Sequence, residues 1–198
     1  MGYAIAQAAR EAGHETTLIS GPAAIAPPKS VAFVPIMTSD ELFDAVHEHV
    51  RTCDVLVMCA AVSDYKPAKF STQKLEKQRD AFTLEFIATR DILASLATGE
   101  RTYLIIGFAA QTHEIEQNAL RKLRAKNCDA IVANDVSRSD SGMESDDNEV
   151  TIFFRDGERK TISRAPKITI ARELVKIISQ LYEKKFDKKN VTLTHKLL

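Results

Sequence analysis

Residues 54–62, which read DVLVMCAAV, are the part of the sequence that most restricts the fold. The run is almost continuously apolar but far shorter than the roughly 20 residues that span a bilayer. A strand of this kind is typical of a parallel sheet whose two faces are both covered by helices. Residues 103–110, YLIIGFAA, repeat the pattern. We therefore expect two buried parallel strands near the centre of one sheet.

Strand-like and helix-like segments alternate along the rest of the chain. Strands are expected at residues 14–20, 31–36, 54–62, 83–87, 103–110, 129–134, 149–154 and 159–164, and helices at 3–12, 39–51, 91–97, 114–126 and 167–184. This order predicts a three-layer, doubly wound (Rossmann-like) and mostly parallel α/β sheet with a C-terminal β-hairpin. Asp156-Gly157 predicts a two-residue type I′ turn in that hairpin. We expect one domain over residues 1–184, an irregular loop over 63–79, and a loose tail over 185–198.

Composition excludes several classes of protein. The 27 Lys and Arg balance the 27 Asp and Glu, so no overall field attracts nucleic acid or an anionic membrane. No secretory signal or membrane span is visible, and a cytoplasmic protein is expected. The three cysteines lack C-x-x-C spacing, and the five histidines form no H-E-x-x-H motif, so a disulfide framework and a protein-held transition metal are not expected.

The chain begins directly on a helical pattern at Tyr3. In doubly wound nucleotide-binding folds a strand and a glycine-rich turn come before the first helix, whose N-terminus holds phosphates. We therefore expect that the first strand and the phosphate loop are missing from this sequence. An unusual sheet edge is the alternative.

Four segments that follow predicted strands are candidates for a ligand site, because ligands of open α/β sheets bind beyond the carboxyl ends of the strands. Small residues at 59–61 would let a planar base approach the backbone, and Asp64 could accept a hydrogen bond from a ribose hydroxyl. Lys74 is a mobile charge suited to phosphates. Each feature also has a structural explanation: a small-residue packing site, an ordinary loop aspartate, or solvated surface.

The third and fourth segments follow the strand at residues 103–110. Gly107 permits close backbone approach at the strand end, and the Phe108 ring could contact a base or belong to the core. Lys122 and Lys126 lie four residues apart on one helix face and could hold a triphosphate or a substrate phosphate together. Paired lysines are otherwise the solvated face of a helix.

Six short motifs occur in a fixed order along the chain. They are AAVSDYKP at 60–67, KLEK at 74–77, DIL at 91–93, GFAAQT at 107–112, KLRAKNCD at 122–129 and IVANDV at 131–136. Their order and spacing resemble the phosphopantothenoylcysteine synthetase family, as does the opening MGYAIA. The resemblance covers the chain from Met1 to about Lys184. Departures are Thr89-Arg90, where the family often has Asn-Pro, and Glu76, where it often has lysine.

The resemblance also implies roles for particular residues. It implies contacts of the nucleotide base with Met58, Cys59 and Ala60, with Asp64 nearby. The remaining nucleotide contacts implied are Lys74, Arg90, Asp91, Ile92, Leu93, Phe108, Lys122 and Lys126. Lys74 is the implied catalytic residue, because it would neutralise charge in the transition state.

The reaction implied is the joining of 4′-phosphopantothenate to L-cysteine with CTP and Mg²⁺ on the route to coenzyme A. The resemblance further implies a homodimer, fusion to or association with a flavin-dependent decarboxylase, and a phosphate turn that would end just before Met1. The hairpin at 149–164 is a plausible element for pairing of two subunits. Without the upstream turn, the chain as given is expected to be a defective catalyst.

Two other classes of function stay open from the residues alone. A nicotinamide-dependent Rossmann reductase would share the fold but should show G-x-G-x-x-G, which is not visible. A non-catalytic nucleotide-binding module is the third interpretation. Differential stabilisation by CTP, ATP and NADH would separate the three.

Overall fold

A computed structural model describes residues 1–71, 73–74, 82–111, 114–135, 147–186 and 196–197 of the chain. The helices are α1 (Gly2–Glu11), α2 (Ser39–His49), the 3₁₀ turn η1 (Val50–Thr52), α3 (Ile92–Ser95), α4 (Ile115–Ala125) and α5 (Lys167–Phe186). The strands are β1 (Glu15–Ser20), β2 (Ala32–Pro35), β3 (Val55–Met58), β4 (Tyr65–Pro67), β5 (Phe86–Ala88), β6 (Leu104–Gln111), β7 (Ala130–Asp135), β8 (Asp147–Phe154), β9 (Arg159–Pro166) and β10 (Lys196–Leu197).

Eight strands form the central sheet, in the order β2-β1-β10-β3-β6-β7-β8-β9. The strands from β2 to β7 run parallel, whereas β8 and β9 add an antiparallel hairpin at one edge. The two apolar runs of the sequence pair directly, with Met58 of β3 beside Gly107 of β6. The doubly wound, mostly parallel fold with a C-terminal hairpin is therefore confirmed.

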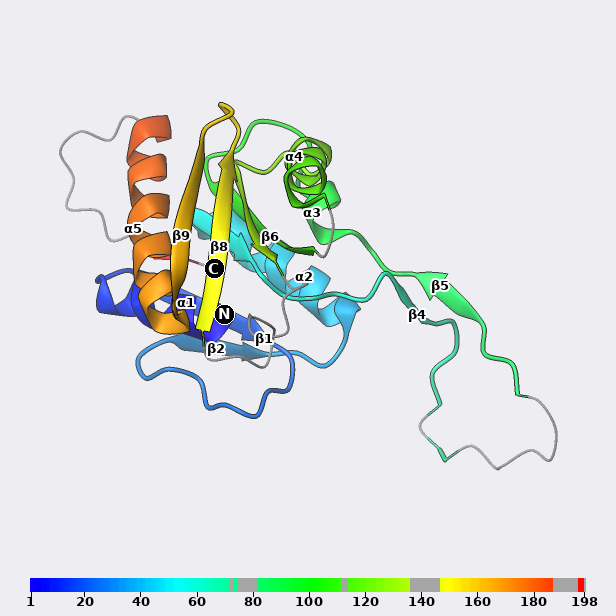
Figure 1. Cartoon of the computed structure of the whole chain (residues 1–198). Helices are drawn as coiled ribbons and strands as arrows, with labels where there is room; N and C mark the ends of the chain where they lie inside the picture. The colour runs from blue at the N-terminus through cyan, green and yellow to red at the C-terminus, as the bar shows by residue number, and fades with distance from the viewer. Residues whose placement is uncertain (72, 75–81, 112–113, 136–146, 187–195, 198) are drawn as a thin grey trace.

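Helices cover both faces of the sheet, as the apolar strands require (Figure 1). On one face α1 and α5 bury residues such as Ile5, Ala9 and Ile170 against β3, β6 and β7. On the other face α2, α3 and α4 form a second core with Leu42, Leu93 and others. Each central strand thus contributes alternate side chains to two cores.

Local signals set several of these helices. Thr38 caps α2, because its Oγ1 accepts a hydrogen bond from the Glu41 backbone N–H at 3.1 Å. Glu41 in turn accepts from the Met37 N–H at 2.7 Å, one residue before the N-cap whose N–H is paired in a regular capping box. Gly13, with φ of 90°, ends α1 in the left-handed region that glycine adopts without strain.

Two local expectations were wrong. The turn at Asp156-Gly157 is not type I′, because only Gly157 has a positive φ and the strands stop at Phe154 and resume at Arg159. Phe154 accepts from the Gly157 N–H at 3.2 Å, so the connection is a longer loop with one left-handed glycine. The segment 63–79 is also not irregular throughout, since β4 forms at Tyr65–Pro67 and pairs antiparallel with β5.

Strands β4 and β5 form the base of an arm, residues 65–88, which projects from the side of the domain (Figure 1). Residues 72 and 75–81 of the arm lie outside the described residues, so most of the KLEK motif does too. Of the expected tail at 185–198, only residues 185–186 and 196–197 are described, and 136–146 lie outside the described residues as well. The domain limit at residue 184 stays a prediction, and α5 runs to Phe186.

Candidate functional site

The carboxyl end of β3 lies beside the middle of β6, and this pairing forms the centre of the candidate site. Met58 ends β3, and Cys59 and Ala60 follow it directly. Phe108 lies one residue beyond Gly107, the β6 partner of Met58. The strand pairing therefore brings together two segments that the sequence singled out, but Gly107 and Phe108 lie within β6, which continues to Gln111.

Lys122 projects from α4 onto the middle of β6. Its Nζ donates a hydrogen bond to the Phe108 carbonyl oxygen, with a separation of 2.5 Å. Burial lowers the pKa of Lys122, and Lys126 acts in the same direction, whereas Asp91 and Asp64 favour the charged form. A partly buried ammonium beside β6 is a group that an incoming phosphate would stabilise.

Lys126, one turn further along α4, forms an ion pair with the Asp91 carboxylate. The other Asp91 oxygen accepts from the Ala94 N–H at 2.9 Å and so caps α3. Partial burial opposes ionisation of Asp91, but Lys126 and the Ala94 N–H outweigh it and the pKa of Asp91 is lowered. Asp64, Asp91, Lys122 and Lys126 therefore form one cluster of charged residues.

Other predicted residues have structural contacts in this region. Phe108 is half-buried against the core between α1 and α5, and Ile92 and Leu93 are buried core residues of α3. Gly107 is crowded, since a Cβ there would lie 2.7 Å from Ile131 Cδ1 and 3.4 Å from Cys128 Sγ. Packing between β6 and its neighbours explains this glycine without a ligand.

Arg90 is held by α2. Its guanidinium pairs with Asp40 at 3.2 Å and Asp44 at 2.9 Å, and lies 3.9 Å above the Phe43 ring centroid. Asp40 also pairs with Lys66 of β4. The Asp40 carboxylate therefore contacts Lys66 on β4 and Arg90, which follows β5. These two contacts help to set the direction in which the arm leaves the domain.

Lys74 is exposed and lies on the arm between β4 and β5. The arm that carries this residue projects away from the sheet (Figure 1). Lys122 and Lys126 instead contact β6 and the start of α3, so convergence of the three lysines stays a prediction. Loops over active sites commonly move when ligands bind.

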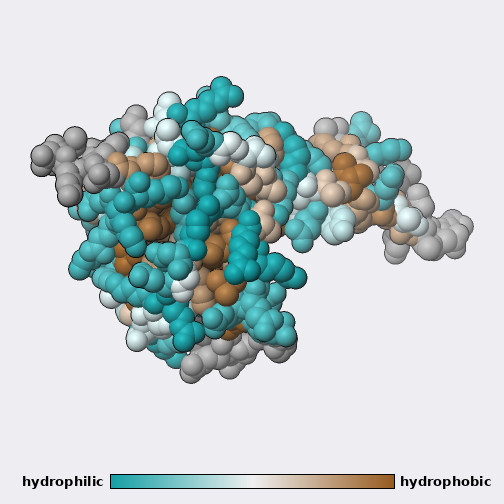
Figure 2. Space-filling view, turned by 90° about the horizontal axis from the view of Figure 1, so that it is seen from above, coloured by the Kyte–Doolittle hydropathy of each residue, from teal (hydrophilic) through white to brown (hydrophobic). Residues whose placement is uncertain are grey.

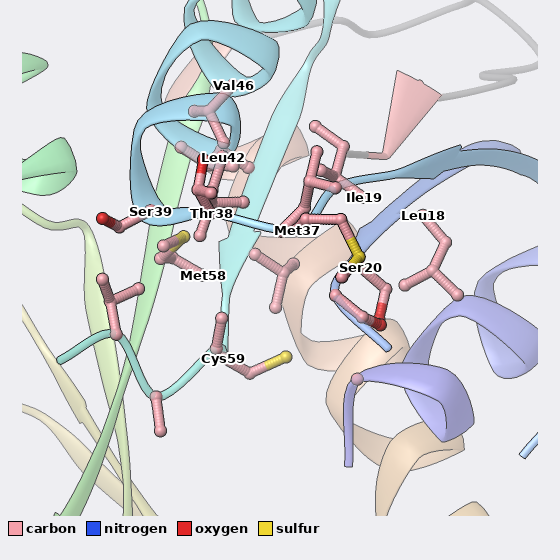
Figure 3. Close-up of a pocket in the computed structure, with 18 of the residues that line it drawn as sticks. Leu18, Ile19, Ser20, Met37, Thr38, Ser39, Leu42, Val46, Met58 and Cys59 are labelled. Carbon is pink, nitrogen blue, oxygen red and sulfur yellow. The ribbon is translucent and has the colours of Figure 1, made fainter. Parts of the chain in front are cut away.

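A cavity of about 540 Å³ lies on the other side of β3 (Figure 3). Met58, Cys59 and Ala60 line it, together with the start of α1, the end of β1 and the first turn of α2. Its walls are mainly apolar, and Ser20, Thr38 and Ser39 are among its polar groups. None of these three residues was predicted from the sequence as a site residue.

The fold places the protein among the doubly wound α/β proteins, whose ligands bind beyond the carboxyl ends of the strands. A family model described as "DNA/pantothenate metabolism flavoprotein C-terminal domain" matches residues 1–182. The chain belongs to this family, which confirms the relationship expected from the six ordered motifs.

Curated relatives carry the name coenzyme A biosynthesis bifunctional protein CoaBC. The protein from Bacillus subtilis is 39% identical over 182 residues, which are 91% of this chain and 45% of that protein. The Escherichia coli K12 protein is 39% identical over 164 residues, covering 80% of this chain and 40% of its own length. The chain thus spans less than half the length of these relatives.

Among solved structures, the C-terminal domain of a coenzyme A biosynthesis bifunctional protein CoaBC superposes with a TM-score of 0.77 at 36% identity. The superposition covers 92% of this chain and 82% of that domain. In the part of the chain that the structure describes, no helix is long and apolar enough to cross a membrane.

Proposed function

We propose that this domain is a phosphopantothenate–cysteine ligase that uses CTP and Mg²⁺ in coenzyme A biosynthesis. The observation that carries the proposal is the cluster of Lys122, Lys126, Asp91 and Asp64 beside β6 and the start of α3, in a member of this family. The bifunctional relatives further support fusion to, or association with, a flavin-dependent decarboxylase in the cytoplasm.

The reaction has two steps. A carboxylate resists attack by an amine because its leaving group would be oxide, so it must first be activated. A carboxylate oxygen of 4′-phosphopantothenate forms a bond to the α-phosphorus of CTP, and the bond to pyrophosphate breaks. The cysteine amine then attacks the acyl carbon, loses a proton and displaces CMP, leaving an amide.

This chain's residues would act by position and charge. Lys122 and Lys126 would exchange their present partners for phosphate oxygens, and the backbone at 58–60 would contact the base. Mg²⁺, which prefers oxygen ligands, would be bound mainly by the triphosphate, with Asp64 as a nearby carboxylate. Lys74 would close over the nucleotide with its loop and neutralise charge as pyrophosphate leaves.

Nucleotide selectivity tests the proposed function directly. We expect CTP with Mg²⁺ to raise the midpoint of thermal unfolding more than ATP or NADH does, since a ligand at 100 times its Kd adds about 2.7 kcal/mol. Equal shifts of the unfolding midpoint with CTP and ATP would contradict the proposal that the backbone at 58–60 recognises the nucleotide base. An increase in the unfolding midpoint with NADH alone would favour a reductase. If the nucleotides raise the midpoint but the full-length protein forms no phosphopantothenoylcysteine, a non-catalytic binding module is favoured.

The helix lysines should determine nucleotide affinity. We expect Lys122→Ala and Lys126→Ala each to raise the Kd for CTP about 10-fold, because each removes one charge-assisted contact from a partly buried site. Arg121→Ala is the control, since Arg121 is exposed on the same helix and contacts Asn118. Calorimetric titration of all three variants gives the comparison. An equal loss of CTP affinity in Arg121→Ala would mean that the helix lysines act only through general electrostatic attraction.

We further propose a homodimer in which the arm makes subunit contacts. Phe70 is 91% exposed and Phe86 53% exposed, and Tyr65, Phe82 and Leu84 add further apolar surface there (Figure 2). The hairpin of β8 and β9, the element expected from the sequence, is an alternative contact because β9 is an edge strand.

The oligomeric state can be measured by light scattering at high micromolar concentration. We expect the mass of a dimer for the protein, and a shift towards monomer when Phe70 and Phe86 are both replaced by serine. Ile25→Ser removes a similarly exposed apolar group from a loop outside the arm and should leave the mass unchanged. A strictly monomeric protein would contradict the dimer, and an unchanged double variant would favour the β8–β9 hairpin.

A further inference from the structure

Asn134 carries a buried hydrogen-bond acceptor that no residue in the described part of the chain satisfies. Its side-chain oxygen, Oδ1, is shielded from solvent and receives no hydrogen bond there. Leaving such a group unpaired is costly, so it commonly marks the place of a ligand, an ion or a water molecule. Asn134 belongs to the IVANDV motif at 131–136, which has no role in the nucleotide site described above.

Asn134 lies on a part of the sheet that extends beyond β3. Strand β3 ends at Met58, which pairs with Gly107, whereas β6 and β7 stay paired past Asn134. These two strands therefore form a wall beside the place where the nucleotide is proposed to bind. Phe108 pairs with Val132, two residues before Asn134, so in a regular sheet the backbones of Phe108 and Asn134 are about 8 Å apart.

The Asn134 side chain faces α1 and α5, as the Phe108 ring does. Successive side chains of a strand alternate between the two faces of a sheet. Ala130 and Val132 of β7 belong to the core under α1 and α5, and so Asn134 points to this face as well. The lysines of the nucleotide site come from α4 on the opposite face. A carbonyl oxygen needs an N–H or O–H donor, so Asn134 Oδ1 is suited to neither phosphate nor carboxylate.

Asn148 on the neighbouring strand supplies the complementary group. Asn134 pairs with Val150 of β8, and Asn148 lies on the same face as Val150, since the exposed Glu149 separates these two buried residues. Diagonal neighbours of this kind have separations of about 7–8 Å. Asn148 Oδ1 accepts from the Glu149 N–H at 3.0 Å, which leaves its Nδ2 as a donor. Among the described residues, none accepts a hydrogen bond from this Nδ2.

We propose that Asn134 and Asn148 bind the amino-acid substrate, with Asn134 Oδ1 accepting from its amino group and Asn148 Nδ2 donating to its carboxylate. An α-amino acid carries a donor and an acceptor on one carbon, which matches the acceptor and donor on these two strands. The Asn134 side chain is partly exposed, so rotation of its amide presents Oδ1 to the ligand. The contact holds one N–H and leaves the nitrogen lone pair for the acyl carbon. This inference rests on the proposed function.

Measuring the two steps of the reaction separately tests Asn134. In the full-length protein, Asn134→Leu should release pyrophosphate from CTP and 4′-phosphopantothenate at the parent rate when cysteine is absent. The KM for L-cysteine should rise about 30-fold, as expected for the loss of one hydrogen bond to a charged group. Asn134→Asp keeps an acceptor oxygen and should recover most of this loss. Because Oδ1 has no partner to lose, leucine should not lower Tm.

Asn148→Asp tests the contact with the carboxylate. This substitution keeps the acceptor for the Glu149 N–H but replaces the donor with a negative charge. It should raise the KM for L-cysteine at least ~30-fold, yet it should use cysteamine, which lacks the carboxylate, no less well than the parent does. Thr151→Val is the control, since Thr151 lies on the other face of β8 and bonds Thr161 at 3.1 Å. The control should change neither step.

Three outcomes would overturn the proposal. An unchanged KM for L-cysteine in Asn134→Leu would overturn it and leave the ligase activity in place. Slower release of pyrophosphate without cysteine, or a higher KM for 4′-phosphopantothenate, would assign Asn134 to the first step. A parent protein that forms no phosphopantothenoylcysteine would overturn the proposed function, and this inference with it.

Discussion

Replacing Lys74 with glutamine should slow formation of the acyl nucleotide by about 100-fold in the full-length enzyme, because one preorganised cation at developing charge contributes about this much. Glutamine keeps a polar side chain of similar length but removes the charge. The prediction rests on the proposed function and on movement of the arm loop towards the nucleotide. Release of pyrophosphate in a single turnover measures the step directly.

Lys69→Gln is the matched control for Lys74→Gln. Both lysines are exposed on the arm, so both substitutions lower the net charge of the arm equally. The control should change the rate little. Similar losses in the two variants would indicate that the arm acts only through its overall charge. A rise in the KM for CTP with an unchanged single-turnover rate would make Lys74 a binding residue instead of a catalytic one.

Asp129→Asn should lower the free energy of unfolding by about 3 kcal/mol, because it leaves a buried charge without its partner. The Asp129 and Arg101 side chains are each 6% exposed, and their charged atoms lie 3.3 Å apart. Lys185 donates to the other Asp129 oxygen at 2.7 Å, and the Ile105 N–H donates at 2.8 Å. Urea unfolding at constant m-value measures the loss.

Asp156→Asn provides the control for Asp129→Asn. Asp156 pairs with Lys184, the neighbour of Lys185 on α5, but this pair is exposed. Exposed pairs contribute little because water and salt screen them, so this variant should unfold almost as the parent does. If both variants lost the same free energy of unfolding, burial of the Asp129 ion pair would not explain its contribution to stability.

Asp129 illustrates what a motif leaves undetermined. It closes the KLRAKNCD motif, whose two lysines contact β6 and the start of α3 in the candidate site. Asp129 itself precedes β7 and ties that strand to the start of β6 and to α5. This motif therefore contains both candidate site residues and a residue that stabilises the fold. The residue types and their spacing in the sequence do not distinguish the two roles.

The sequence by itself determined the fold class, the positions of most strands and helices, and the family. These depend on local information: apolar runs at 54–62 and 103–110, the capping box at Thr38 and Glu41, and the ordered motifs. It also placed Lys122 and Lys126 on one helix face, because a spacing of four residues fixes that relation in any α-helix.

Tertiary structure alone decided which of these residues meet. Pairing of β3 with β6 brings residues 58–60 next to Phe108, while the arm that carries Lys74 projects away from the sheet. Arg90 pairs with Asp40 and Asp44, about 50 residues away in the chain, a contact that no local pattern contains. The order of the strands in the sheet is likewise decided only by the tertiary structure, since it depends on packing and on hydrogen bonds between distant segments.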